Sequence, residues 1–506
     1  MKKYKYIAMA LAFGMFATAC GNKAESPANT LEAEAAEADS VSQLFSNRDL
    51  SGAYDEEQCE RITLSDGNSA SEAEGVTVDG NTITITKEGD YLINGSLSNG
   101  MVIVDADKTE KVQLILNGVN INSETSAAIY VKQADKVFVT LADGTTNVLT
   151  NGGSFLAIDD NNIDAVIFSK DDLTLNGTGS LVISSPAGHG VVSKNDLVIT
   201  NGSYEITAAS HGLSGKDSVA AADGSFDIEA GKDAVHSEND EDDTAGNVYI
   251  ADGNFSLCAE SDGISAMNEI YIAGGSIVVE QSYEGIEGRV INIYGGEIDI
   301  TSSDDGLNAT DKRTKAASET EADKTKERKD FAKKFQGGGM DDTQSDASIH
   351  IAGGIITIDA EGDGIDSNGY LTVSGGEVYI AGPSNGGNGA LDYGIDASIS
   401  GGIVVAAGQS GMAQNFGSES TQGAILISTQ QQNEAGSDIV LLDSDGRELA
   451  AWNMKKNYNS VVISCPEIED GGSYTVKTGE TTTEVTMDGL IYGETSAFGG
   501  GMRRKN

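Results

Sequence analysis

The sequence predicts an all-β protein: a parallel β-helix with about 22 residues and three short strands per coil, followed by a small antiparallel β cap at the C-terminus. Three observations support this fold. A Gly-centred turn recurs at nearly constant spacing, apolar residues alternate on both sides of it, and a third short Gly-bounded segment completes each repeat.

The recurring turn sets the length of a coil. Successive marker glycines are separated by 22, 29, 22, 21, 58, 22 and 26 residues. A unit near 22 residues with occasional insertions indicates a solenoid. The long step places an insertion, rich in Lys and Glu, at 312–346, and we expect a mobile loop there. The markers are Gly202, Gly224, Gly253, Gly275, Gly296, Gly354, Gly376 and Gly402.

The apolar alternation defines the interior. Ile270 and Ile272 precede one turn, and Ile277 and Val279 follow it. Because alternate residues of a strand point to opposite faces, these side chains line one core. The segment Gly-Ile-Ser-Ala at 263–266 is an example of the third strand. A leucine-rich repeat has a similar period but requires regular leucines and an asparagine, and a propeller blade is about twice as long.

The remaining segments flank this repeat. The β-helix is predicted over 59–423, with wider coils and an end cap in its first part. Apolar runs separated by Asp-Gly and Gly-Gly turns predict a C-terminal β domain over 424–492. Residues 493–506 are predicted to be a disordered tail, and 21–58, rich in Ala, Glu and Ser, a disordered tether.

The N-terminus resembles a lipoprotein signal. Lysines at positions 2, 3 and 5 precede an apolar stretch, and Ala-Thr-Ala-Cys follows at 17–20. The resemblance implies cleavage of residues 1–20, lipidation of Cys20 and an extracellular protein anchored to the bacterial membrane. An ordinary signal peptide is the alternative.

Charge and cysteine content limit the partners. The formal net charge is −47, and removal of the signal, with three lysines and no acid, makes it −50. Nucleic acid is therefore excluded as a partner. Cys59, Cys258 and Cys465 are widely scattered and give no disulfide framework. We expect a monomer.

Acidic residues recur in the third segment of each coil. Its frame is acid-Gly-Ile/Leu-polar-small, so the acid lies at the turn and the polar residue faces outward. Stacked carboxylates repel one another, whereas Ca²⁺ takes 6–8 oxygen ligands in flexible geometry. The frame therefore predicts a calcium site, with solvated Asp-Gly turns as the alternative. No His/Cys cluster for a transition metal is evident. The predicted ligands are Glu284, Glu287, Asp305, Asn308, Asp363, Asp366 and, by the same frame, Asp396.

Two further columns are candidates for binding or chemistry. Tyr249 and Tyr271 lie in one outward column and are candidates for packing against sugar rings, with surface filling as the alternative. Lys194, Lys216 and Arg289 each follow a His-Gly or Glu-Gly turn. In a calcium-dependent lyase such a residue abstracts the proton α to the uronate, although solubility alone also explains these charges.

One histidine motif invites comparison with polygalacturonases. Gly188-His189-Gly190, with Asp159-Asp160 upstream, resembles part of their active site. The Asn-Thr-Asp and Arg-Ile-Lys motifs of that family are missing, and His211-Gly212 repeats the frame one coil on. His189 is therefore interpreted as a member of a turn ladder.

A wider resemblance covers residues 60–480. Val-Thr-Val-Asp-Gly-Asn-Thr-Ile-Thr-Ile at 76–85, Gly-Asp-Tyr-Leu-Ile-Asn-Gly at 89–95 and Leu-Asn-Gly-Val at 116–119 resemble bacterial carbohydrate-binding domain-containing proteins. The resemblance implies a right-handed parallel β-helix with bound calcium, binding cellulose or polygalacturonate without established catalysis. The sequence thus predicts a calcium-assisted, non-catalytic polysaccharide-binding lipoprotein. A calcium-dependent, pectate-type polysaccharide lyase and a structural adhesin are the alternatives.

Overall fold

A computed structural model describes residues 44–313 and 346–493 of the chain. All of them belong to one compact unit that begins at Leu44. The predicted signal peptide with Cys20, residues 21–43 of the tether, the insertion from 314 to 345 and the tail from 494 lie outside the described residues. Among the described residues, no helix has the length and apolar character that a membrane span requires.

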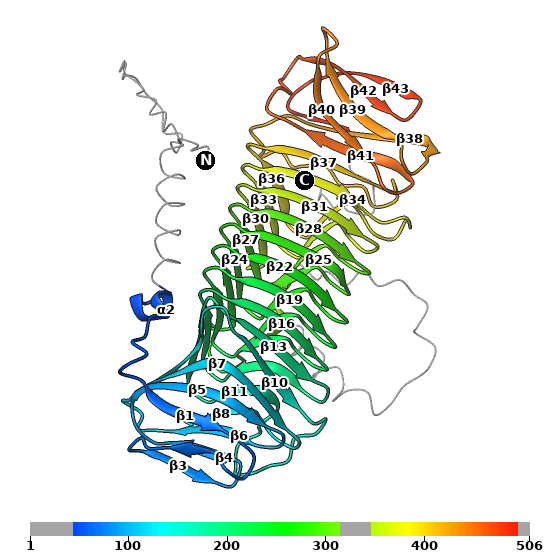
Figure 1. Cartoon of the computed structure of the whole chain (residues 1–506). Coiled ribbons are helices and arrows are strands. Elements are labelled where there is room, and N and C mark those ends of the chain that lie inside the picture. The colour runs from blue at the N-terminus through cyan, green and yellow to red at the C-terminus, as the bar shows by residue number, and fades with distance from the viewer. Residues whose placement is uncertain (1–43, 314–345, 494–506) are drawn as a thin grey trace, which may run out of the picture. The chain divides into compact units, whose positions relative to one another are not determined.

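The parallel β-helix predicted from the sequence is confirmed. Its strands form three parallel ladders, each strand pairing with its counterpart in the next coil (Figure 1). The first ladder, before the turn glycine, comprises β9 (Lys136–Leu141), β12 (Asp172–Gly177), β15 (Asp196–Ile199), β18 (Ser218–Ala221), β21 (Asn247–Ile250), β24 (Glu269–Ile272), β27 (Val290–Ile293), β30 (Ser348–Ile351), β33 (Tyr370–Val373) and β36 (Asp396–Ile399).

The second ladder follows the turn glycine. It comprises β10 (Thr146–Asn151), β13 (Ser180–Ser185), β16 (Ser203–Ala208), β19 (Ser225–Ala230), β22 (Asn254–Ala259), β25 (Ser276–Ser282), β28 (Glu297–Ser302), β31 (Ile355–Ala360), β34 (Glu377–Ala381) and β37 (Ile403–Gly408). The long strands β5 (Gly89–Leu97) and β7 (Lys111–Ser123) start this double face, and β7 pairs with both β9 and β10.

The third ladder holds the shortest strands. It comprises β4 (Thr82–Ile85), β6 (Met101–Asp105), β8 (Ile129–Gln133), β11 (Ala165–Ser169), β14 (His189–Ser193), β17 (Leu213–Gly215), β20 (Val235–Ser237), β23 (Ile264–Ala266), β26 (Ile286–Gly288), β29 (Leu307–Ala309), β32 (Ile365–Ser367) and β35 (Leu391–Tyr393). From β4 to β35 these strands pair in parallel, one per coil.

The interior contains the residues that the alternation predicts. Ile264, Ile272 and Val279 come from the three ladders of one region and are at most 1% exposed. Tyr204, Phe226 and Phe255 stack in successive coils with ring centroids 5.2 and 4.4 Å apart. Burying each such side chain contributes about 1.5–3 kcal/mol.

The turn glycines explain why the repeat is regular. All eight markers have positive φ, a conformation that L-residues rarely adopt. At Gly275, with φ 91°, a Cβ atom would also lie 2.7 Å from the carbonyl oxygen of Gly253 in the preceding coil. Both the turn and the close stacking of coils therefore require glycine here.

Both ends of the helix are covered. Near the N-terminus, β1 (Glu60–Leu64) pairs with β5, and β2 (Ala70–Ser71) and β3 (Val76–Asp79) add antiparallel strands. At the other end, β41 (Tyr458–Ser464) pairs antiparallel with β37, alongside β38 (Ala424–Asn433) and β44 (Ile491–Tyr492). A separate antiparallel sheet comprises β39 (Asp438–Asp443), β40 (Glu448–Asn453), β42 (Ser473–Thr478) and β43 (Thr481–Thr486).

Part of the predicted tether is ordered, which corrects the boundary at 58. Residues 47–51 form helix α2 (Asn47–Ser51), whose N-terminus is closed by a capping box of Ser46 and Asp49. The Asp49 carboxylate is 1% exposed and lies 2.8 Å from Nζ of Lys136. Composition alone suggested a solvated segment, but this buried ion pair holds it against the first ladder, together with hydrogen bonds that Thr174, Asn176 and Thr200 donate to Asp49.

Candidate functional site

The third ladder carries a continuous row of acidic side chains. In the strands, the pairing aligns Glu287 with Asn308, Asn308 with Asp366 and Asp366 with Asp392. At the preceding turns, main-chain hydrogen bonds link each coil to the next, as from Gly285 to Asp305. The acids at the turns and the outward-facing polar residues of the strands therefore form two adjacent columns. We call this row the acidic ladder; it consists of Asp262, Glu284, Glu287, Asp305, Asn308, Asp363, Asp366 and Asp392.

Asp396 does not belong to this row, which corrects the prediction for this residue. Asp396 starts β36 in the first ladder, opposite Tyr370, and Asp392 occupies the expected position. Two similar frames lie four residues apart, Ala-Leu-Asp at 390–392 and Gly-Ile-Asp at 394–396. The length of the preceding loop determines which of them forms the third strand.

The carboxylates of the acidic ladder are more enclosed than the sequence suggested. Glu284, Glu287 and Asp305 are at most 9% exposed because the coils above and below cover them. Burial, with neighbouring carboxylates, raises the pKa of Asp305 to about 6 and that of Asp363 to about 8. Burial also raises the pKa of Glu284, and the negative charge of Glu287 is the next largest cause.

The first acidic group already holds a positive charge. Carboxylate oxygens of Asp262, Glu284 and Glu287 lie within 4.8 Å of one another. The ammonium of Lys312 contacts Glu287 and lies 2.8 Å from Oγ of Ser265. Burial opposes the charge on Lys312, but the carboxylates of Glu287, Asp262 and Asp233 together outweigh it and raise the pKa of the lysine.

The second acidic group is formed by Asp305, Asp363 and Asp366, whose ligand atoms also lie within 4.8 Å of one another. Within the described residues, no Lys, Arg or His forms a salt bridge with Asp305 or Asp363. Nearby, Asn308 donates its amide to Glu284 at 2.9 Å, and its buried Oδ1 has no hydrogen-bond partner among the residues that the structure describes. An oxygen-rich group with such an acceptor fits a hard cation such as Ca²⁺.

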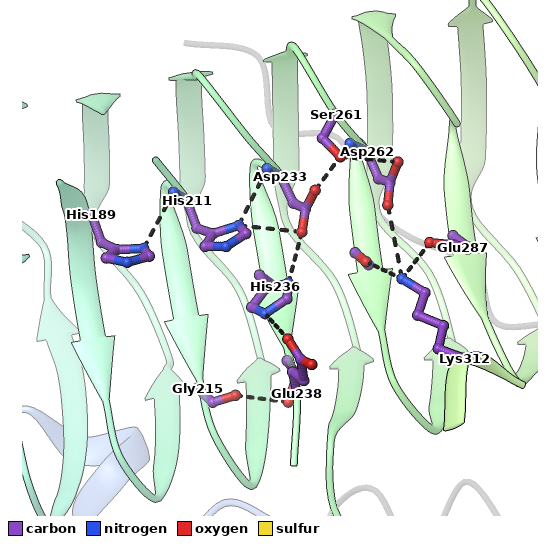
Figure 2. Close-up of polar contacts among 12 residues, drawn as sticks. His189, His211, Gly215, Asp233, His236, Glu238, Ser261, Asp262, Glu287 and Lys312 are labelled. Carbon is purple, nitrogen blue, oxygen red and sulfur yellow. Dashed lines mark hydrogen bonds and ion pairs between the residues drawn. The ribbon is translucent and has the colours of Figure 1, made fainter. Parts of the chain in front are cut away.

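The ladder continues toward the N-terminus as a stack of imidazoles, shown in Figure 2. The ring centroids of His189 and His211 are 5.0 Å apart, and those of His211 and His236 are 3.9 Å apart. Burial lowers the pKa of His189 to about 3 and also lowers that of His211. At His236 burial acts in the same direction, but Asp233 and Glu238 outweigh it and raise the pKa.

This stack corrects the expectation that the chain lacks a His cluster. His211, Asp233 and His236 present ligand atoms within 4.8 Å of one another. The sequence showed the His-Gly frame at 189 and 211, but at the next coil the turn residue is Asp233, and His236 occupies the strand position. The turn column, which holds His211, and the strand column, which holds His236, come into contact only when the coils stack.

The basic candidates lie in two places. Lys194 and Lys216 line a pocket of about 320 Å³ together with the three stacked histidines. Lys216 pairs with Glu241, and Nζ of Lys194 lies 5.4 Å from the ring centre of Phe168. Arg289 is three coils further along.

Arg289 is held by its neighbours rather than directed at the acidic ladder. Its Nε donates to Oδ1 of Asn268 at 3.1 Å, and Nη1 lies 4.0 Å from Asp346. The structure therefore does not gather Lys194, Lys216 and Arg289 into one site.

The tyrosine column has the predicted register but limited exposure. Tyr249 pairs with Tyr271 in the first ladder, as expected. Tyr271 is 4% exposed and stacks on Tyr294 at 4.8 Å, while Tyr249 is half-buried. Tyr271 thus has no open ring face for a sugar in this conformation.

A different tyrosine is exposed beside the acidic ladder. Tyr283 directly precedes Glu284, follows an irregularity in β25 and is 51% exposed. A hydrogen bond with Asp304 raises the pKa of Tyr283 to about 12. β-Bulges commonly redirect a side chain at binding sites, and no periodic pattern in the sequence indicated this one.

Comparisons with known proteins identify the family of this chain. A family model described as carbohydrate-binding domain-containing protein matches residues 79–326 and 280–389. A protein of that description from Acetivibrio thermocellus is 39% identical over 141 residues, or 28% of this chain. The chain belongs to the carbohydrate-binding domain-containing family.

The matches to individual proteins are partial. The alignment spans 49% of the A. thermocellus relative, so this chain matches about half of its length. A solved structure described as the polysaccharide lyase-like protein from C. thermocellum, gadolinium derivative, is 35% identical. It covers 44% of this chain and 91% of its own, with a TM-score of 0.43.

Proposed function

We propose that this protein binds polysaccharide without cleaving it, and that calcium held by the acidic ladder assists binding. Cellulose and pectin-like glycans are the proposed ligands. Membership of a carbohydrate-binding family supports the ligand class. The second acidic group, Asp305, Asp363 and Asp366, is the observation that carries the calcium part of the proposal.

The electrostatics of that group favour a divalent cation. Two carboxylates about 5 Å apart repel by roughly 1 kcal/mol in water and by several times more where desolvated. Burial and this repulsion together raise the pKa of Asp363, and binding a proton relieves both. Ca²⁺ would relieve it at neutral pH, with Asp305, Asp363, Asp366 and Oδ1 of Asn308 as the residues that hold it. Bound there, it would supply positive charge for the carboxylates of an acidic glycan.

We propose the cellular location of the protein from its sequence alone. A signal over residues 1–20 supports an extracellular protein held at the bacterial membrane by lipid on Cys20. Cys20→Ala should move the protein from the membrane fraction to the soluble fraction. An unchanged distribution would contradict lipid anchoring.

The main test is retention of the mature protein on insoluble cellulose and on calcium-pectate, with and without chelator. We expect chelator-sensitive retention that the double variant Asp363→Asn, Asp366→Asn loses. The exposed pair Asp79→Asn, Asp445→Asn removes the same charge away from the acidic ladder and should bind normally. Chelator-resistant retention would contradict the calcium part, and no retention on either polymer would favour an adhesin.

A lyase is the second candidate because Lys194 and Lys216 share a pocket with His211 on the same face. A basic residue beside a bound uronate can abstract the α-proton. The supernatant of the retention assay distinguishes the two functions. Accumulating absorbance from unsaturated uronide would identify a lyase, whereas binding without it supports the non-catalytic function.

A further inference from the structure

Three of the four histidines of the chain gather in one stack. His189, His211 and His236 lie in successive coils, and the fourth, His350, lies in β30 of the first ladder. Because the chain has four histidines, this placement brings three of its four imidazoles together. Imidazole and carboxylate together suit a borderline cation such as Zn²⁺, rather than Ca²⁺.

The carboxylate of Asp233 links two of these imidazoles. Its Oδ2 lies 3.2 Å from Nδ1 of His211 and 2.7 Å from Nδ1 of His236 (Figure 2). On the far side of His236, Nε2 lies 3.4 Å from Oε2 of Glu238. Asp233 is 5% exposed, so water replaces these contacts poorly.

One contact in this group leaves two acceptors facing each other. The main-chain N–H of Asp233 donates to Nδ1 of His211 at 3.3 Å, so this nitrogen acts as an acceptor. The same nitrogen faces Oδ2 of Asp233 at 3.2 Å. A lone pair and a carboxylate oxygen at this distance repel one another unless a proton on Nδ1 or another positive charge lies between them. A metal ion supplies such a charge.

We propose that His211, Asp233 and His236 form a binding site for a zinc-class divalent ion. In a tetrahedral zinc site, with bonds of about 2.0–2.2 Å, the ligand atoms lie roughly 3.3 Å apart. The distance of 3.2 Å between Nδ1 of His211 and Oδ2 of Asp233 is close to this value, whereas the 2.7 Å between Nδ1 of His236 and the same oxygen is a hydrogen-bond distance that must lengthen when an ion binds. Glu238 or a solvent molecule in the adjacent pocket takes the remaining position.

The stacking of the rings sets a condition on the site. His211 and His236 are inclined by only 14°, and a metal ion must lie in the plane of each imidazole that binds it. One ring must therefore turn about its Cβ–Cγ bond when the ion binds, and both His211 and His236 line the adjacent pocket. His189 does not belong to this group, because its Nε2 faces Asp164, at 3.9 Å, rather than Asp233.

The first test is a Zn²⁺ titration of metal-free full-length protein by calorimetry, in excess Ca²⁺ so that oxygen-only sites do not contribute. We expect one zinc site, and at least a 100-fold loss of affinity in His236→Ala and in Asp233→Asn. His350→Ala removes an imidazole elsewhere and should change affinity less than threefold. Equal losses in His236→Ala and His350→Ala, or no zinc binding by the wild type, would overturn the proposal.

A measurement on the unaltered protein covers variants that fail to fold. With four histidines in the chain, the imidazole NMR signals can be resolved and assigned individually. Zn²⁺ should shift the signals of His211 and His236 at one equivalent and leave His350 unchanged. Co²⁺ should give the intense visible bands of a four-coordinate ion. Shifts absent from His211 and His236, or spread equally over all four residues, would overturn the proposal independently of calcium or glycan binding.

Discussion

The Nζ atom of Lys312 lies 3.9 Å from Oδ2 of Asp262, so a side chain at the start of the insertion places a positive charge inside the acidic ladder. The same ammonium contacts Glu287. The two acidic groups therefore differ. The group at Asp262 is balanced by a lysine, whereas Asp305 and Asp363 of the second group form no salt bridge with any Lys, Arg or His among the described residues.

Lys312→Met should destabilise the protein mainly when calcium is absent. Removing the ammonium leaves buried carboxylates without their partner, which costs about 2 kcal/mol for a lysine that keeps 28% exposure. Urea unfolding in chelator should show this loss, and millimolar Ca²⁺ should recover most of it. The exposed Lys455→Met is the control and should change neither curve. A loss of the same size in calcium and in chelator would mean that packing, not charge, explains the effect.

Stability in chelator should fall as pH rises from about 4 to about 8. The folded protein keeps the Asp363 proton up to a pKa of about 8, whereas the unfolded chain loses it near the ordinary value of 3.8. Between these values the native state binds more protons, so unfolding free energy falls by up to about 1.4 kcal/mol per pH unit for this group. Denaturant unfolding at several pH values measures the slope.

Asp363→Asn should make that slope shallower, because the variant has no carboxyl proton to lose at this position. Asp305 and Glu284, whose pKa values are also raised, keep their share of the slope. Asp445→Asn, which alters an exposed residue in the turn between β39 and β40, should keep the wild-type slope. Added calcium should flatten the wild-type curve as well, since it replaces the proton. Identical slopes for wild type and Asp363→Asn would show that Asp363 titrates normally.

The repeat made most of the fold predictable. Turn glycines and β-branched residues such as Ile272 recur because every coil packs against its neighbours in the same way. A coil that is ambiguous in sequence can therefore be assigned by comparison with the adjacent coils. The same logic placed Glu287, Asn308 and Asp366 in one column. It failed at Asp396, where the coil length changes and two frames compete.

Features outside the period were not predictable in the same way. His236 stands in the strand column while His211 stands in the turn column, and their contact exists only after the coils stack. Lys312 reaches the acidic ladder from beyond the end of β29. The short helix at 47–51 had one local signal, the Ser-x-x-Asp capping box, within a segment whose composition otherwise indicates disorder.

Asp49→Ala should lower the unfolding free energy by about 3 kcal/mol. The substitution leaves the Lys136 ammonium, 15% exposed, without its carboxylate, and Thr174 without the acceptor that lies 2.6 Å away. Glu57→Ala removes an exposed acid from the same segment and should change stability by less than about 0.5 kcal/mol. Thermal and urea unfolding measure both. Equal, small effects would show that residues 44–58 do not pack in solution.

Tyr283→Ala should weaken glycan retention without changing stability. The ring is 51% exposed next to Glu284, so it offers an apolar face to a sugar within reach of the acidic ladder. Retention on cellulose should fall about five- to tenfold, and Tyr283→Phe should keep most of it because the ring remains. Tyr370→Ala, which removes a 43% exposed tyrosine from β33, is the matched control and should bind normally. If both alanine variants bind like the wild type, the sugar does not contact Tyr283, and the binding face must be sought elsewhere on the third ladder.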